Sequence, residues 1–365
     1  MKKITALILL LATIFTFTAC KNSEYKPIPS TEEESRVILS FEIEKEKYEV
    51  KYELYRALFL NMAQKYDAGN KDFWKTEAAK EAIPKINNEV FSLAADIFAA
   101  IHLSKKIGYD PYSSKTDKLI EEYIEKSING DGESIEGFGS DYNLYLEHLK
   151  KFNLNYSVQV LLYRYAIAYD KVIEYYKGTV NEDNPTTDMQ IGALSYTKDD
   201  VLNFYNSEES VRVSMIVMNS LYISKENAQK KRNAIAAEPD QESALIKAIG
   251  LTSGDANDIL NGIVIGKNSL DPAYYGDVTN SAFALDIFET SNVIELSLET
   301  RSEYWILYRM QKTNEHFESD YENIESAFVS QKIGEILNEV KNDLLESLKT
   351  TDEFNALDYS SIEMK

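Results

Sequence analysis

The chain has 365 residues, with 39 Lys and Arg against 60 Asp and Glu, and a formal net charge of −21. Hydrophobic residues make up 44% of it and aromatic residues 12%, which excludes a disordered chain and is enough to build the cores of two domains. The acidic balance argues against nucleic acid as a partner, because that binding depends on neutralising phosphates with clustered Lys and Arg. Cys20 is the only cysteine, so no intramolecular disulfide can form.

The first twenty residues predict export. A basic start at Met1-Lys2-Lys3 is followed by an apolar stretch over residues 4–17 and then by Thr18-Ala19-Cys20. This pattern resembles a bacterial lipoprotein signal, which implies that residues 1–19 are a signal peptide and that Cys20 is the lipidated residue. We therefore expect a lipid anchor in a bacterial cell membrane, with the folded part on the extracytoplasmic side. An uncleaved signal-anchor helix is the alternative, but residues 4–17 are short for a membrane span.

The next segments predict a tether, a β-hairpin and a set of helices. Residues 20–35 contain two prolines and an acidic run without periodicity, which is typical of a flexible tether. Residues 37–43 alternate in polarity and can pair with residues 47–50 across a charged turn. Apolar periodicity near 3.6 then predicts helices over residues 52–66, 76–107, 116–128, 141–152 and 156–176.

The last of these helices is rich in tyrosine, with Tyr163, Tyr165 and Tyr169 on different faces. Such a distribution usually marks the boundary between core and surface. A groove that binds unfolded segments through rigid rings is the alternative.

A polar stretch with many helix breakers over residues 178–195 predicts a domain boundary. Thr197 and Asp200 then form a capping-box pattern that begins a short helix. A strong β pattern covers residues 211–218, helices are predicted over 225–237 and 243–249, and a second strong strand covers residues 303–309.

This order of segments resembles the parvulin-type peptidyl-prolyl isomerase domain. In that family a strand R-x-x-H-I-L-V opens the domain, an A-F-x-L segment lies under the prolyl pocket, and a strand G-Y-H-I-I-K-L closes it. The corresponding segments here are residues 212–218, 282–285 and 303–309. Phe283 is retained, whereas Met215 and Trp305 replace the two histidines, and neither can shuttle protons as imidazole does. The resemblance therefore implies a peptide pocket at Met215, Phe283 and Trp305 without an assignable catalytic residue, and isomerase activity that is weak or lost.

The N-terminal hairpin and helices, which end in Ser104-Lys105-Lys106-Ile107-Gly108, resemble exported chaperones of the SurA and PrsA type. In that group a C-terminal helix packs onto the N-terminal region, and the pattern over residues 318–348 predicts such a helix. The resemblance implies an α+β fold with a mainly helical chaperone-like domain over residues 36–195 and 316–350. A parvulin-like domain over residues 196–315 would be inserted into it.

The remaining chemistry is sparse. The three histidines, His102, His148 and His316, are far apart and are each expected at the surface or its boundary, so we predict no metal site and no cofactor. The function implied is a lipid-anchored folding factor whose partners are unfolded or extended exported polypeptides. The alternative is a cell-envelope lipoprotein that binds a specific protein partner or solute without chaperone activity.

Overall fold

The computed structural model describes residues 29–67, 70–130, 137–177, 193–248, 260–270, 272–297 and 302–363. The predicted signal peptide, Cys20 and most of the predicted tether lie outside these residues. The chain divides into two compact units: unit 1 comprises residues 1–175 and 336–365, and unit 2 comprises residues 176–335. Each unit combines helices with a small antiparallel sheet, which confirms the predicted α+β class.

The sheet of unit 1 contains the predicted hairpin. Strands β1 (Val37–Ile43) and β2 (Glu46–Lys51) pair antiparallel, and the two-residue turn between them places Glu44 and Lys45 at φ 50° and 71°. Positive φ at both central residues is what a two-residue hairpin turn of type I′ requires. Strand β7 (Lys349–Thr350) adds to the free side of β1 and gives the order β2-β1-β7. This strand was not predicted, because two residues cannot show a period.

The helices of unit 1 follow the predicted ones closely. They are α2 (Glu32–Ser35), α3 (Tyr52–Asp67), α4 (Glu77–Lys106), α5 (Ser114–Asn129), α6 (Tyr142–Lys151), α7 (Tyr156–Lys177) and α15 (Asp352–Asn355), with 3-10 turns at Lys71–Lys75 and Tyr359–Ser361. Helix α2 lies in the predicted tether. It forms because Thr31 and Glu34 make a capping box, and because the Arg56 guanidinium bonds the Glu34 carboxylate at 2.8 Å.

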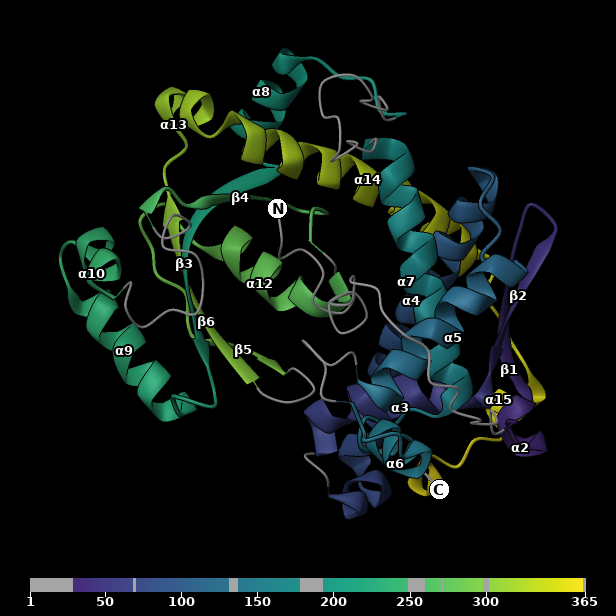
Figure 1. Ribbon diagram of the computed structural model, residues 1–365. Helices are drawn as coiled ribbons and strands as arrows, with labels where there is room; N and C mark the ends of the chain where they lie inside the picture. Colours follow the sequence, from purple (N-terminus) through teal and green to yellow (C-terminus); the bar gives the residue numbers. More distant parts are fainter. Residues whose placement is uncertain are drawn as a thin grey trace. The chain divides into compact units, whose positions relative to one another are not determined.

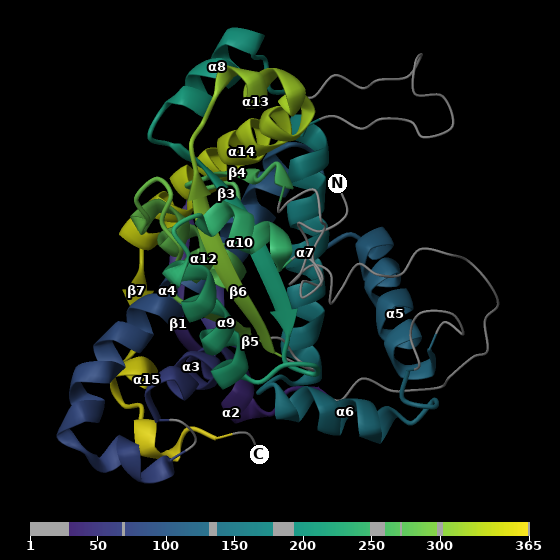
Figure 2. The same ribbon diagram turned by 90° about the vertical axis from the view of Figure 1, so that its left-hand side faces the viewer.

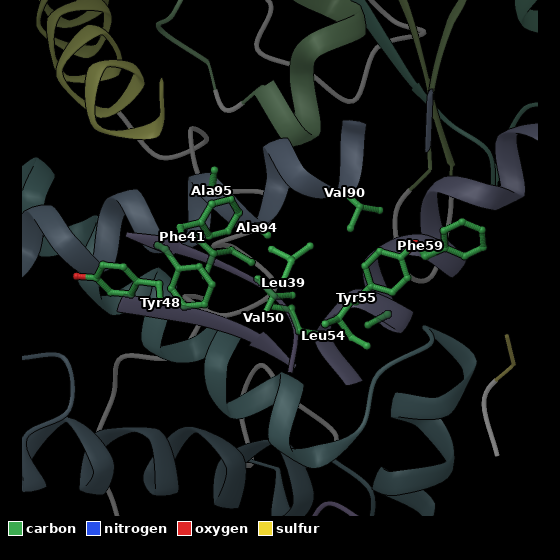
Figure 3. Close-up of a cluster of buried hydrophobic side chains, with 14 of the residues drawn as sticks. Leu39, Phe41, Tyr48, Val50, Leu54, Tyr55, Phe59, Val90, Ala94 and Ala95 are labelled. Carbon is green, nitrogen blue, oxygen red and sulfur yellow. The ribbon is translucent and has the colours of Figure 1, made fainter. Parts of the chain in front are cut away.

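One large hydrophobic core joins the strands of unit 1 to α3 and α4. Figure 3 shows Leu39, Phe41 and Val50 from the strands in a cluster with Ala94 and Ala95 of α4. All five side chains are completely buried. The small alanines of α4 leave room for the aromatic and aliphatic side chains of the strands, which fill the space between helix and sheet.

Unit 2 is built around a four-stranded antiparallel sheet with the order β4-β3-β6-β5 (Figure 2). Its strands are β3 (Ser210–Asn219), β4 (Ile263–Gly266), β5 (Ile294–Ser297) and β6 (Ser302–Met310). Its helices are α8 (Lys198–Asn206), α9 (Lys225–Ala237), α10 (Gln241–Lys247), α12 (Pro272–Ala284) and α13 (Asn314–Ser319), followed by α14 (Tyr321–Glu346), which continues past residue 335.

The predicted helix over residues 318–348 is therefore interrupted. Helix α13 ends at Ser319, because the φ of −125° at its C-cap residue Asp320 leaves the helical region, and α14 begins at Tyr321.

The two faces of the unit 2 sheet are covered by different helices. Helices α9 and α10 cover one face, and α12 covers the other (Figure 1). On the α9 and α10 face, Ile216 and Met218 of β3 and Ile306 of β6 are almost completely buried. The opposite face carries the residues that the sequence singled out.

Candidate functional site

The two strands that carry the sequence resemblance are neighbours in one sheet, as predicted. Strands β3 and β6 pair antiparallel, with Met215 opposite Leu307 and Val217 opposite Trp305. Residues opposite each other in a pair point to the same face, and residues two apart share it. Met215 and Trp305 therefore lie diagonally on the same face of the sheet.

Helix α12 covers this face incompletely. The ring of Tyr275 in α12 packs edge-on against the Trp305 ring, with 5.8 Å between centroids. Val217 and Leu307 are buried beneath the helix, whereas Met215 and Trp305 are only half-buried. A thioether and an indole are thus partly accessible to solvent on one sheet face.

Phe283 lies in the last turn of α12 and is also half-buried. Arg309 of β6 holds this end of the helix, because its guanidinium donates to the carbonyl oxygens of Phe283 at 3.3 Å and Leu285 at 2.7 Å. The ammonium of Lys267 stands 5.9 Å from the centroid of the Phe283 ring. The structure thus places Phe283 on the helix that covers the sheet face of Met215 and Trp305.

The side chains of this face offer apolar contacts rather than proton transfer. Methionine and aromatic side chains contribute contact area and adapt to irregular partners. The indole N–H of Trp305 donates to the Glu303 carboxylate at 3.2 Å and cannot act as a base. None of the three histidines belongs to β3, β6 or α12.

Two histidines that we expected near the surface are in fact buried. His102 is 2% exposed and His316 is 5% exposed, and His148 is half-buried. The Nδ1 atoms of His102 and His316 each lie 3.0 Å from a tyrosine hydroxyl, of Tyr48 and Tyr205 respectively. Because these tyrosines are far away in sequence, the pairing could not be predicted from local pattern.

Burial lowers the pKa of both buried imidazoles. The carboxylates of Glu46 and Glu44 oppose this effect at His102. At His316, Arg212 lowers the pKa further and Asp320 opposes it. We therefore interpret these histidines as neutral, buried side chains that help to pack each unit. We assign them no catalytic role.

A cavity of about 460 Å³, which was not predicted from the sequence, lies elsewhere in unit 2. Its walls come from α8, from the residues on either side of α8, and from α14. They include the rings of Tyr196, Phe204 and Phe328 and the charged groups of Lys332 and Glu335. The regular spacing of Phe328, Lys332 and Glu335 along a helix was the only available signal, and that spacing is equally typical of a surface helix.

Within the described residues, no cluster of three or more His, Cys, Asp or Glu could hold a metal ion. No helix in the described part of the chain is both long enough and apolar enough to cross a membrane.

No family model matches the chain, and no curated protein matches it. Among solved structures it is similar to foldase protein PrsA from Streptococcus pneumoniae, at 14% identity over 74% of this chain and 88% of that one, with a TM-score of 0.24. Foldase protein PrsA from Lactococcus lactis matches at 14% identity over 90% and 100%, and peptidylprolyl isomerase PrsA from Bacillus cereus at 14% over 86% and 92%, both with a TM-score of 0.24. A TM-score this low does not establish a shared overall fold, so these proteins assign no activity to the chain.

Proposed function

We propose that the protein is an extracytoplasmic folding factor that binds extended polypeptide and has weak or no prolyl isomerase activity. In this proposal it is anchored through Cys20 in a bacterial cell membrane. Residues 196–315 form the parvulin-like domain, and residues 36–195 with 316–350 form a helical chaperone-like domain. One observation carries the proposal: Met215 and Trp305 stand half-buried on the same face of paired strands, at the positions where the family has histidines.

This face suits peptide binding because its apolar groups are held in place yet partly exposed. Trp305 is braced by Tyr275, and the helix end that carries Phe283 is fixed by Arg309. Burial of an apolar side chain contributes about 25 cal/mol per Å² removed from water, so a bound segment that covers these groups gains affinity without a conformational change.

The same face is poorly suited to isomerisation. Rotation about a peptide bond has a barrier of about 18–20 kcal/mol, and a catalyst must stabilise the twisted amide more than the planar one. Met215 and Trp305 offer no imidazole for that purpose. Binding without efficient turnover is the expected behaviour.

The test measures how far the full chain suppresses aggregation of several unrelated unfolded clients. We expect suppression by the native chain, and about tenfold weaker client binding for the double variant M215A/W305A. Tyr222→Ala is the matched control, because Tyr222 is 88% exposed in the connection between β3 and α9 and lies outside this face. Failure to suppress aggregation of any client would refute the proposal.

A protease-coupled assay with proline-containing peptides tests the catalytic half of the proposal. We expect no turnover above background. Clear turnover that disappears in Phe283→Ala would show that the half-buried phenylalanine belongs to a working isomerase site.

The cavity in unit 2 favours a second candidate function, the binding of one specific solute or protein partner. Its volume of about 460 Å³ lies within the range of about 300–1,000 Å³ found for small-ligand sites. A folding factor should protect several unrelated clients, whereas a specific binder should protect none of them. The aggregation assay therefore separates the two functions.

A further inference from the structure

The connection between α12 and β5 makes a tight turn over residues 286–289. The amide of Glu289 donates to the carbonyl oxygen of Asp286 at 3.1 Å, and the Glu289 carboxylate accepts from the amide of Asp286 at 2.9 Å. The two central residues of this turn are Ile287 and Phe288, whose side chains are 51% and 54% exposed. The turn therefore holds two large apolar side chains in solvent.

Phe288 has a backbone conformation that normally belongs to glycine. Its φ is 71°. The amide of Phe288 donates to the carbonyl oxygen of Arg309 at 2.8 Å, and the amide of Arg309 donates to the carbonyl oxygen of Glu289 at 3.0 Å. Residues 288 and 289 thus both oppose residue 309, which is a β-bulge of the G1 type beside the edge strand β5. The first residue of such a bulge is usually glycine, because a Cβ atom is strained at positive φ.

The side chain of Phe288 is not needed to form the turn or the bulge. Their hydrogen bonds are made by backbone atoms and by the Glu289 carboxylate, so glycine at position 288 would keep them and would relieve the strain. Burial does not compensate for the strain either, because more than half of the side chain is exposed. A large apolar side chain that is exposed at the expense of stability indicates a role in binding rather than in folding.

Arg309 joins this turn to the proposed peptide face. Its guanidinium donates to the carbonyl oxygens of Phe283 at 3.3 Å and Leu285 at 2.7 Å. Its backbone makes the two hydrogen bonds of the bulge that contains Phe288. One residue therefore fixes both the end of α12 that carries Phe283 and the turn. Side chains that are held in this way need little further ordering when they bind a partner.

The register of the sheet gives the separation between the turn and Met215. Met215 is opposite Leu307 on one side of β6, and the bulge is opposite Arg309 on the other side. The two positions are therefore two strand spacings of about 4.8 Å apart across the sheet and two residues of about 3.3 Å apart along it, or roughly 12 Å in all. An extended peptide covers this distance in about four residues, and side chains four residues apart point to the same side.

We propose that the Ile287–Phe288 turn is a second anchor point for bound polypeptide, which takes an apolar side chain about four residues from the one held by Met215 and Trp305. The inference rests on the proposed function, because it names the kind of client segment that the same site prefers. That segment is extended and carries two large apolar side chains with three residues between them. A fixed aromatic ring suits this role, since it offers a large contact area at low entropic cost.

The charges beside the turn disfavour a membrane as its occupant. Asp286 and Glu289 flank the two apolar side chains and are themselves exposed. Insertion of the turn would bring both carboxylates to the surface of an anionic bilayer, and the net charge of −21 adds to the repulsion. An apolar peptide segment meets no such repulsion, so we assign the turn to polypeptide.

The test uses two short labelled peptides and the full chain. Both peptides have a Gly-Ser background; one carries two Phe residues four positions apart, and the other has Ser in place of the second Phe. Fluorescence anisotropy titrations should show that the peptide with two Phe residues binds at least about fivefold tighter than the peptide with one.

Phe288→Gly assigns this difference to the turn and separates binding from folding. The variant should bind the two-Phe peptide about fivefold more weakly, bind the one-Phe peptide as before, and unfold at a temperature no lower than that of the native chain. Phe288→Ala removes the ring but keeps the Cβ atom, so it should lose the same affinity without the relief of strain. Leu144→Ala is the matched control, because Leu144 is 55% exposed on α6 in unit 1 and should change neither affinity.

Equal affinity of the two peptides, or unchanged binding of the two-Phe peptide by Phe288→Gly, would overturn the inference. A clear fall in the unfolding temperature of Phe288→Gly would also overturn it, because the ring would then have a structural role. Binding of the native chain to phosphatidylglycerol vesicles that disappears in Phe288→Gly would assign the turn to a membrane instead. Each of these results leaves the proposed function standing if the native chain still suppresses client aggregation, whereas loss of that suppression refutes the proposed function itself.

Discussion

The two sheets of the molecule use their apolar residues differently. In the sheet of unit 1, Leu39, Phe41 and Val50 are completely buried against helices. In the sheet of unit 2, Ile216 and its neighbours are buried on one face, whereas Met215 and Trp305 on the other remain half-buried. Burial of apolar surface is the main stabilising term in folding, so a closed face contributes stability and a partly open face keeps some of that surface for binding. The first sheet therefore contributes mainly stability, whereas the second leaves apolar surface accessible for the binding that we propose.

The largest expected effect is at the closed sheet. Phe41→Ala removes a completely buried ring from the core shown in Figure 3 and should lower the stability of unit 1 by about 3–5 kcal/mol. Hydrogen exchange at the amides of β1 and α4 measures this loss without assuming that both units unfold together. Phe288→Ala is the control, because Phe288 is 54% exposed and should change stability by less than about 1 kcal/mol. Similar losses at both positions would contradict the assignment of this sheet as the closed one.

The second prediction compares adjacent residues of β3. Ile216, which is 1% exposed, faces α9 and α10, and Met215 faces α12. Ile216→Ala should destabilise unit 2 by about 2–5 kcal/mol, and Met215→Ala by about 1 kcal/mol while it reduces client binding. Hydrogen exchange of β3 and β6 amides, together with the binding assay, gives both quantities. If Met215→Ala destabilises as much as Ile216→Ala, the α12 face is closed and the comparison between the sheets fails.

The third prediction concerns the free-energy cost of burying the carboxyl group of Asp170 in unit 1. Burial, and then the charge of Glu174, raise the pKa of Asp170 in α7 to about 6. Because the folded pKa is higher than the ordinary value of 3.8, the stabilisation from the protonated form of Asp170 is complete below pH 3.8 and is lost as the pH rises through about 6. Asp170→Asn should therefore stabilise unit 1 by roughly 1–3 kcal/mol at pH 7 and have little effect at pH 3.5.

Asp240 in unit 2 has a pKa that is shifted in the opposite direction, so Asp240→Asn should have the opposite effect on stability at pH 7. Hydrogen bonds from Ser243 lower the pKa of Asp240, so its substitution should remove stability at pH 7. Thermal unfolding at the two pH values measures both variants. An Asp170→Asn variant that is less stable than the native chain at pH 7 would show that its carboxylate has a favourable partner when ionised.

Much of the fold was predictable because it rests on local pattern. The apolar periodicity of the long helix α4 and the β patterns of strands β3 and β6 predict which type of element each segment forms. The register of β3 on β6 then places Met215 and Trp305 on one face of the sheet. The contacts that were missed all depend on residues distant in sequence. His102 contacts Tyr48 in the hairpin, and the cavity in unit 2 depends on the contact between the rings of Phe204 and Phe328. No periodic pattern along one segment can indicate such pairs.

The smallest expected effect tests the two buried histidines, one in each unit. Since burial lowers the pKa of His102 and His316, both are neutral in the folded chain over a range where the unfolded chain takes up protons. These two groups therefore leave stability unaffected well above pH 6.5, and stability falls as the pH drops below it. Proton NMR titration of the imidazoles in the full chain measures both pKa values directly.

The groups that face each histidine sharpen this prediction. His102 faces the carboxylates of Glu44 and Glu46, with the ammonium groups of Lys105 and Lys106 beside them, whereas His316 faces Arg212 and Asp320. Glu46→Gln should lower the pKa of His102 further and leave that of His316 unchanged, because a carboxylate that favours the protonated imidazole has been removed only in unit 1. A rise in the His102 pKa in this variant would mean that the hydrogen bond to Tyr48, rather than charge, controls the proton on this ring.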